Sequence, residues 1–220
     1  LVAHTRLGDK GDDVFKDLVD IAGNYLQPST SVTIDYLVSV PPTANLRIEN
    51  KFGNVYLDDP SGSVNLNLSY GNLTCNRLTA RSELRVTGGD ADISYIRDGQ
   101  VYLSYGNLRI HEAGNLFTET RSAGVNIDRC ASLKVDSRRD RLFVNDVEIL
   151  AGQAYFTQSR IGTLHSEMNY TSRYGSLSVS QIRKSFETLN LLAELTTVSL
   201  SFEKPMSFNF ELNHHQDLTF

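Results

Sequence analysis

The chain has 220 residues, 40% of them hydrophobic, no Trp, and a formal net charge of −5. The acidic balance disfavours nucleic-acid binding, which requires concentrated Lys and Arg. No stretch approaches the roughly 18 consecutive apolar residues of a membrane-spanning helix, so we expect neither a nucleic-acid partner nor a transmembrane segment.

Residues 1–31 precede the regular part of the sequence and are expected to form a lead-in or a cap. Within residues 12–27, apolar side chains recur at helical spacing, and Pro28 closes the segment. This pattern predicts a short amphipathic cap helix, with an irregular lead-in that ends in a strand as the alternative. The chain begins with Leu1 rather than Met, and we expect any targeting segment to have been removed.

From residue 32 to 205, an apolar pattern recurs about every 18 residues. We number each repeat from an anchor position, the residue that corresponds to Gly53 in the first repeat. The nine anchor positions are Gly53, Gly71, Gly89, Gly106, Ala123, Asp140, Gly162, Gly175 and Thr196. A fixed short period of this kind is typical of a solenoid or a propeller, in which one repeat cannot bury its apolar face alone.

The positions around each anchor predict which side chains face inward. Residues two and four after the anchor are apolar in almost every repeat and alternate with polar residues, which indicates strands with one buried face. A further apolar column seven residues after the anchor contains Leu78, Ile96, Ala113, Cys130, Val147 and Ile182. Each repeat therefore supplies two strands and a shorter third side. We predict an all-β, single-domain parallel β-helix of about nine coils, followed by a last strand (207–212) and a tail within residues 206–220.

The inward–outward alternation slips at the anchor, which predicts a bent, left-handed backbone there, where Gly is tolerated. The Asn residues that follow several anchors are expected to hydrogen-bond along the β-helix axis. Cys75 and Cys130 fall in inward columns three coils apart, too far for a disulfide. We therefore predict two free, buried thiols.

The segment 40–57 and the later segments 103–108 and 135–140 resemble a known family. The first begins Val-Pro-Pro-Thr-Ala-Asn-Leu and continues into Asn-Lys-Phe-Gly-Asn-Val, and the second contains Tyr105, Gly106 and Asn107. Together they are similar to the adhesin-type domains of Gram-negative gut bacteria, a family of Tyr-Gly-Asn-repeat β-helix domains of unknown function. The resemblance covers most of residues 32–212. It implies a β-helix, export to the periplasm or cell surface and a role in adhesion, and it supplies no catalytic residues.

Candidate binding residues lie in the outward columns. Tyr56, Tyr102 and Phe143 could stack on a glycan or a protein partner. Asp92 and Arg109 share one outward column in neighbouring coils, where a salt bridge between the coils or a polar site would explain them. We expect the aromatic residues before the anchors, Phe52, Tyr70, Tyr105 and Tyr174, to stack inside the β-helix instead.

Two kinds of chemistry are alternatives to this binding role. A polysaccharide-active, pectin lyase-like β-helix enzyme would need carboxylates and a basic residue held together, and the outer columns supply only Asp92 with Arg109 and a mixed group of Asp136, Arg138 and Asp140. His214 and His215 have no third ligand at suitable spacing. We expect a non-enzymatic, exported, adhesin-like protein without metal or cofactor, which binds a glycan or a cell-surface protein.

Overall fold

The computed structural model describes residues 2–7 and 34–205, together with 207, 209 and 211, and side chains from Tyr36 onward. The chain divides into two compact units, Leu1–Pro42 and Thr43–Phe220. In the first unit, β1 (Val2–Leu7) pairs antiparallel with β2 (Ile34–Ser39). The expected cap helix over 12–27 lies outside the described residues, and so do 208, 210 and 212 of the expected last strand. Residues 207, 209 and 211 are not in a strand.

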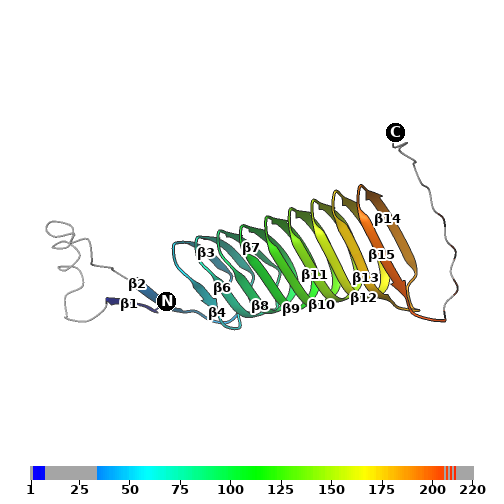
Figure 1. The fold of residues 1–220 in the computed structure, drawn as a ribbon. Coiled ribbons are helices and arrows are strands. Elements are labelled where there is room, and N and C mark those ends of the chain that lie inside the picture. Colours follow the sequence, from blue (N-terminus) through cyan, green and yellow to red (C-terminus); the bar gives the residue numbers. More distant parts are fainter. Residues whose placement is uncertain (1, 8–33, 206, 208, 210, 212–220) are drawn as a thin grey trace. The chain divides into compact units, whose positions relative to one another are not determined.

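The second unit is a parallel β-helix, as predicted from the repeat (Figure 1). Every strand pair in it is parallel, and each coil pairs with the coil before and after it. Its strands are β3 (Leu46–Lys51), β4 (Val55–Leu57), β5 (Val64–Ser69), β6 (Leu73–Leu78), β7 (Ser82–Thr87), β8 (Ala91–Ser104), β9 (Asn107–Arg121), β10 (Gly124–Arg138), β11 (Arg141–Tyr155), β12 (Gln158–Arg173), β13 (Ser176–Ile182), β14 (Thr188–Glu194) and β15 (Thr197–Phe202). Within the described residues there is no helix long and apolar enough to cross a membrane.

The core consists of the predicted inward columns, stacked like on like. The column seven residues after the anchor is buried throughout, from Leu78 and Ile96 to Ile182. Two residues after the anchor, Leu73, Leu108 and most of their equivalents are no more than 2% exposed. Because equivalent residues are Cα partners in neighbouring coils, each apolar side chain packs on another of its own column. Cys75 and Cys130 are free and buried, as predicted.

The left-handed backbone was predicted at the wrong residue. It occurs at the residue before each anchor, not at the anchor itself. The nine residues concerned are Phe52, Tyr70, Gly88, Tyr105, Ser122, Arg139, Phe156, Tyr174 and Leu195, with φ between 46° and 69°. Glycine is needed at several anchors for a different reason. A Cβ atom on Gly71 would collide with the carbonyl oxygen of Gly53 in the preceding coil. The coils approach too closely there for any side chain.

The seventh anchor was also predicted wrongly. The residue in left-handed conformation in that coil is Phe156, so the anchor is Thr157 and not Gly162. Successive left-handed residues are then 18, 18, 17, 17, 17, 17, 18 and 21 apart. The pairing of β11 with β12 agrees with this anchor, because it is in register from Arg141↔Gln158 to Val147↔Leu164. One extra residue enters β12 only after Leu164 and lengthens the next interval, from Phe156 to Tyr174, to 18 residues. Gly162 lies against Asn145 of the preceding coil, which is not an anchor.

The aromatic residues before the anchors point outward, contrary to the inward stack expected from their parity. Phe52 is 72% exposed, and Tyr105 is 64% exposed. The backbone slips one residue earlier than expected, which turns these side chains away from the core. The predicted axial hydrogen bonds of the asparagines are present: Asn54 Oδ1 accepts from Asn72 N at 2.9 Å, and Asn72 Oδ1 accepts from Asp90 N at 2.9 Å.

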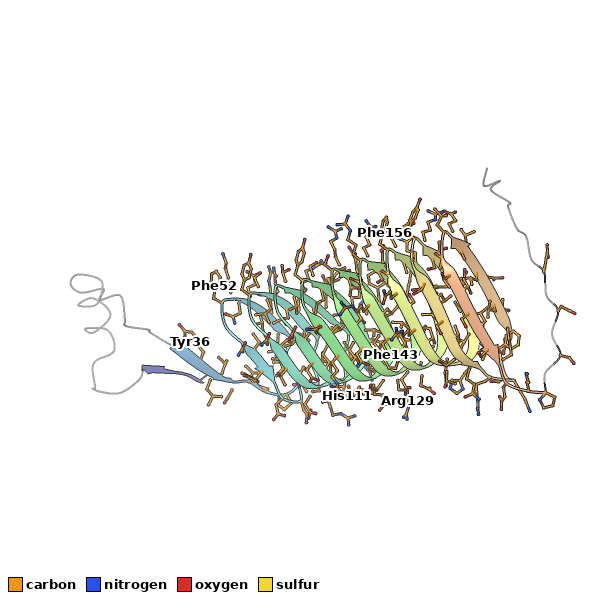
Figure 2. All side chains as sticks on the ribbon, in the orientation of Figure 1. Tyr36, Phe52, His111, Arg129, Phe143 and Phe156 are labelled. Carbon is orange, nitrogen blue, oxygen red and sulfur yellow. The ribbon has the colours of Figure 1, made fainter. Side chains whose placement is uncertain are left out.

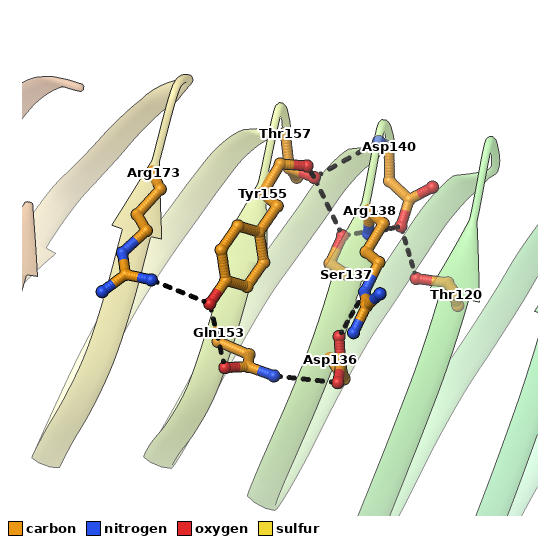
Figure 3. Close-up of polar contacts among 9 residues, drawn as sticks. All are labelled: Thr120, Asp136, Ser137, Arg138, Asp140, Gln153, Tyr155, Thr157 and Arg173. Carbon is orange, nitrogen blue, oxygen red and sulfur yellow. Dashed lines mark hydrogen bonds and ion pairs between the residues drawn. The ribbon is translucent and has the colours of Figure 1, made fainter. Parts of the chain in front are cut away.

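The sixth anchor, Asp140, is 3% exposed and holds its corner together through its carboxylate. Its Oδ2 accepts hydrogen bonds from the hydroxyls of Thr120 and Ser137, both at 2.6 Å (Figure 3). Its Oδ1 accepts from Ala123 N at 2.8 Å. A buried carboxylate with several donors is fully satisfied without a ligand. Asp140 is therefore a structural part of the corner and does not belong to a surface group with Asp136 and Arg138.

Candidate functional site

Outward side chains of the β-helix form straight rows because neighbouring coils are in register. Four of the five predicted binding residues share one such row, which runs along β4, β6, β8, β9, β10, β11, β12, β13 and β15. Its members are Tyr56, Thr74, Asp92, Arg109, Asn126, Phe143, Arg160, Ser178 and Ser199. Tyr56 and Phe143 are 73% and 42% exposed. Five coil steps of about 4.8 Å separate them, about 24 Å in all, so one small ligand cannot contact both.

Asp92 and Arg109 are Cα partners, but their side chains do not form the expected salt bridge among the described residues. Asp92 Oδ1 lies 3.7 Å from His111 Nε2, and His111 Nδ1 lies 2.8 Å from Asp128 Oδ2. All three side chains are between 43% and 55% exposed. This Asp–His–Asp cluster is a solvated surface arrangement, worth little to stability. Among the described residues, no group of His, Cys, Asp and Glu is placed to hold a metal ion, and His214 and His215 lie outside them.

Tyr102, the fifth predicted residue, lies on a different row and lines a shallow groove of about 260 Å³. We call it the Tyr102 groove. It crosses β7, β8, β9 and β10 and is lined by Arg85, Val86, Thr87, Tyr102, Ser104, Glu119, Thr120, Arg121 and Arg138. Val86 and Thr120 are buried under its floor, and the other residues project from two neighbouring outward rows. The groove therefore rests on packed strands and not on loops.

The Tyr102 ring is held from several sides. The guanidinium carbon of Arg85 lies 3.8 Å from its centroid, a close cation–π contact, and Arg85 Nη2 in turn lies 2.7 Å from Glu83 Oε1. The Phe117 and Tyr102 rings meet in a T-shaped arrangement with centroids 5.9 Å apart. The Tyr102 hydroxyl donates to Gln100 Oε1 at 3.4 Å. Arg85 belongs to the preceding coil and Phe117 to the next one, where Glu119 is the Cα partner of Tyr102.

Two arginines form the other end of the groove. Arg121 and Arg138 are Cα partners on β9 and β10, and both are exposed. Arg138 Nε lies 3.4 Å from Asp136 Oδ1, whereas Arg121 forms no side-chain hydrogen bond or ion pair with any described residue. Figure 3 shows the row continuing past Arg138 to Tyr155 and Arg173, whose Nη1 donates to the Tyr155 hydroxyl at 3.2 Å.

A separate surface runs along the corner formed by the left-handed residues. Phe52 stacks on Tyr70 with centroids 5.3 Å apart, and Phe156 stacks on Tyr174 at 4.9 Å. Phe52 and Phe156 project from the same edge of the β-helix in Figure 2, while His111 and Arg129 lie at the opposite edge. Within each stacked pair, one face of each ring is covered by the other ring.

Sequence reasoning found Tyr102 and considered Arg138, but it missed Arg85, Glu119 and Arg121. A signal was present for the last of these. Arg121 and Arg138 are 17 residues apart, one repeat length in this part of the chain, and both lie one residue before a left-handed corner residue. Their period alone makes them neighbours on successive coils.

Comparisons of the chain with protein-family models, with curated proteins and with solved structures found no match.

Proposed function

We propose that this protein is a non-enzymatic, adhesin-like component of the cell envelope that binds a glycan in the Tyr102 groove. The observation that carries the proposal is the combination of Tyr102 with charged and hydroxyl side chains on one rigid face. Sugars offer a ring with apolar C–H faces and several hydroxyl groups. An aromatic ring beside hydrogen-bonding groups of both kinds complements them. Tyr102, Glu119 and Ser104 provide such a set within one groove.

Rigidity supports the same proposal. The groove residues extend from strands whose inward neighbours are buried, and Tyr102 is fixed by Arg85 and Phe117 before any ligand arrives. A preorganised site loses little conformational entropy on binding. Export to the periplasm or cell surface rests on the resemblance of residues 40–57 to adhesin-type domains. Separation of cells into cytosolic, periplasmic and surface fractions would test it, and recovery of the protein together with a cytosolic marker protein would contradict it.

A glycan array with the purified protein tests binding, and variants locate the site. Tyr102→Ala should abolish the array signal, and Tyr102→Leu, which keeps apolar bulk against Phe117, should weaken it while preserving the fold. Tyr56→Ala removes a tyrosine ring from the other row, where it is more exposed than Tyr102, and serves as the control. An array without signal, or a signal lost in Tyr56→Ala and kept in Tyr102→Leu, would contradict the proposal.

A second candidate function is a polysaccharide-active, pectin lyase-like enzyme. The observation that favours it is the cluster of Asp92, His111 and Asp128 beside Arg109, which brings carboxylates, an imidazole and a guanidinium to one edge of the row. A polyuronide activity screen tests it, because a lyase would release products with an unsaturated uronate chromophore. Activity that disappears in Asp92→Asn and in Arg109→Gln would establish the enzyme and replace the binding proposal.

A further inference from the structure

Arg121 and Arg138 occupy directly opposed positions on neighbouring coils, an arrangement that like charges normally avoid. They are Cα partners in the parallel pairing of β9 with β10. Like charges opposite each other in a sheet are destabilising. The chain has a net charge of −5, so the juxtaposition does not follow from an excess of basic residues. An anion bound between the two guanidinium groups would turn the repulsion into attraction.

The neighbouring carboxylate does not neutralise Arg121, although the spacing allows it. Two residues apart on one strand face, Glu83 lies 2.7 Å from Arg85, Arg47 lies 2.8 Å from Glu49, and Asp136 lies 3.4 Å from Arg138. Glu119 and Arg121 have the same spacing and are both exposed. Yet among the described residues neither makes a side-chain hydrogen bond or an ion pair.

Glu119 and Arg121 line the Tyr102 groove without pairing with each other, so a carboxylate acceptor and a guanidinium donor remain for a ligand. Charged groups that line the groove are Arg85, Arg121, Arg138 and Glu119, three positive and one negative, an excess of 3 − 1 = +2. Two of these arginines have carboxylate partners just outside the lining, so Arg121 is the cation with most capacity left. A guanidinium binds planar carboxylates and sulfates through paired hydrogen bonds.

We propose that the Tyr102 groove selects an acidic glycan. The carboxylate or sulfate group of the sugar binds between Arg121 and Arg138, a ring hydroxyl donates to Glu119, and the apolar face of the ring packs on Tyr102. This assignment rests on the proposed glycan-binding function and names its ligand class. The row of Arg121, Arg138, Tyr155 and Arg173 continues along the β-helix axis, so a polymer can follow it across several coils.

The direct test is calorimetric titration of the protein with an oligogalacturonate and with its methyl ester. Both probes have the same ring and length, and only the first has free carboxylates. We expect the acid to bind and the ester to bind at least about tenfold more weakly, since the ester cannot form charge-assisted hydrogen bonds to the two guanidinium groups. A heparin-derived oligosaccharide of equal length distinguishes sulfate from carboxylate as the preferred anion, and either preference supports the proposal.

Variants assign the effect to residues. Arg121→Gln should weaken binding of the acidic probe by about ten- to hundredfold and leave the weak binding of the ester nearly unchanged. Arg129→Gln makes the same charge change at an exposed site at the opposite edge and should leave both affinities unchanged (Figure 2). Binding of the acidic probe should also weaken with added salt.

Different failures have different meanings. Equal affinity for acid and ester, lost in Tyr102→Leu, would overturn the acidic selectivity and retain the glycan-binding function. Binding of polyglutamate as tightly as of oligogalacturonate would overturn the selectivity for a sugar. Absence of binding to every glycan probe would overturn both proposals.

Discussion

The hydroxyl oxygens of Ser159 and Tyr170 lie 3.0 Å apart inside the β-helix, and each is the polar partner of the other in an apolar core. In its own column Ser159 is smaller than its neighbour in the preceding coil, and Tyr170 is larger than its neighbour. Ser159 is the Cα partner of Leu142, and Tyr170 is the Cα partner of Gly152. A small residue in one column is thus matched by a large one in the other. The core keeps its volume at the cost of two buried hydroxyls.

Removing one hydroxyl should therefore cost more than removing both. Tyr170→Phe leaves the Ser159 hydroxyl buried without a partner, and we expect the free energy of unfolding to fall by about 1–3 kcal/mol. The double variant Tyr170→Phe with Ser159→Ala should recover part of that loss. Urea denaturation of the two variants and the parent protein measures both steps. A double variant clearly less stable than Tyr170→Phe would contradict this account, because the Ser159 hydroxyl would then stabilise the fold without its Tyr170 partner.

Alkaline pH should destabilise the protein through three buried acids. Burial raises the pKa of the Cys75 and Cys130 thiols from 9.0 to about 12, and it raises the pKa of Tyr170 from 10.0 to about 12. Between pH 9 and 12 the unfolded chain releases protons that the folded chain retains. The free energy of unfolding must then fall as the pH rises. Below about pH 9 these groups are protonated in both states and have no effect.

Denaturant midpoints measured from pH 8 to 10.5 test this dependence. The parent midpoint should be flat at first and then fall, while Cys75→Ala combined with Cys130→Ala should show a shallower fall from pH 9 onward. Equal slopes for the two proteins would mean that the thiols are accessible in the folded state. Thiol titration supplies a check, because both cysteines should react only after unfolding.

Glycine is required at Gly71 and dispensable at Gly53, although both are anchors. A Cβ on Gly71 collides with a backbone carbonyl, which cannot move. A Cβ on Gly53 meets only the Asn50 side chain, at 3.2 Å, and this side chain, which donates to Gly53 O at 2.8 Å, can give way more easily than a backbone carbonyl. We expect Gly71→Ala to cost about 1–3 kcal/mol and Gly53→Ala to be close to neutral. Thermal or urea unfolding of this matched pair measures the difference. Similar losses in both variants would contradict the close approach of the coils.

The exposed ring of Tyr105 should not be needed for stability. Its φ of 59° costs a non-glycine residue about 1–2 kcal/mol, it is 64% exposed, and Gly88 and Ser122 occupy the same corner position in the adjacent coils. Glycine at this position avoids the cost of the left-handed conformation but loses about 0.5–1 kcal/mol through backbone entropy. Tyr105→Gly should therefore be as stable as the parent protein or up to about 1 kcal/mol more stable. Phe52→Gly, which also loses the stack on Tyr70, should gain less. A large loss of stability in Tyr105→Gly would show that the ring supports the corner.

The fold could be predicted from the sequence because a repeat records each core position many times. Leu108 and Ile110 stand in columns with about nine members, so occasional exceptions such as Ser159 do not hide the period. The exact position of each anchor within the repeat was harder to predict. The seventh anchor, Thr157, keeps the 17-residue spacing from Asp140, but the polar Ser159 interrupts the apolar column two residues after it, and Gly162 attracted the assignment instead.

The groove was less predictable for a physical reason. Inward residues are constrained by packing, and their identity therefore reports their position, whereas outward residues are free to vary. Parity alone placed Tyr102 outward but did not show that Glu119 and Arg121 leave each other unpaired. It also placed Phe52 and Tyr70 inside, because the slip one residue earlier leaves no mark on the alternation of polar and apolar residues.

The most direct test of the central claim is to observe the arginine side chains while ligand binds. NMR spectra of the Nε–Hε groups, assigned with Arg→Gln variants, would be recorded during titration with the oligogalacturonate. We predict that the signals of Arg121 and Arg138 shift most and saturate together, that the Arg85 signal shifts less along the same saturation curve, and that Arg129 and Arg160 remain unchanged. Shifts confined to Arg109 and Arg160 would place the ligand on the row of Tyr56 and Phe143 instead and contradict the assignment of the Tyr102 groove.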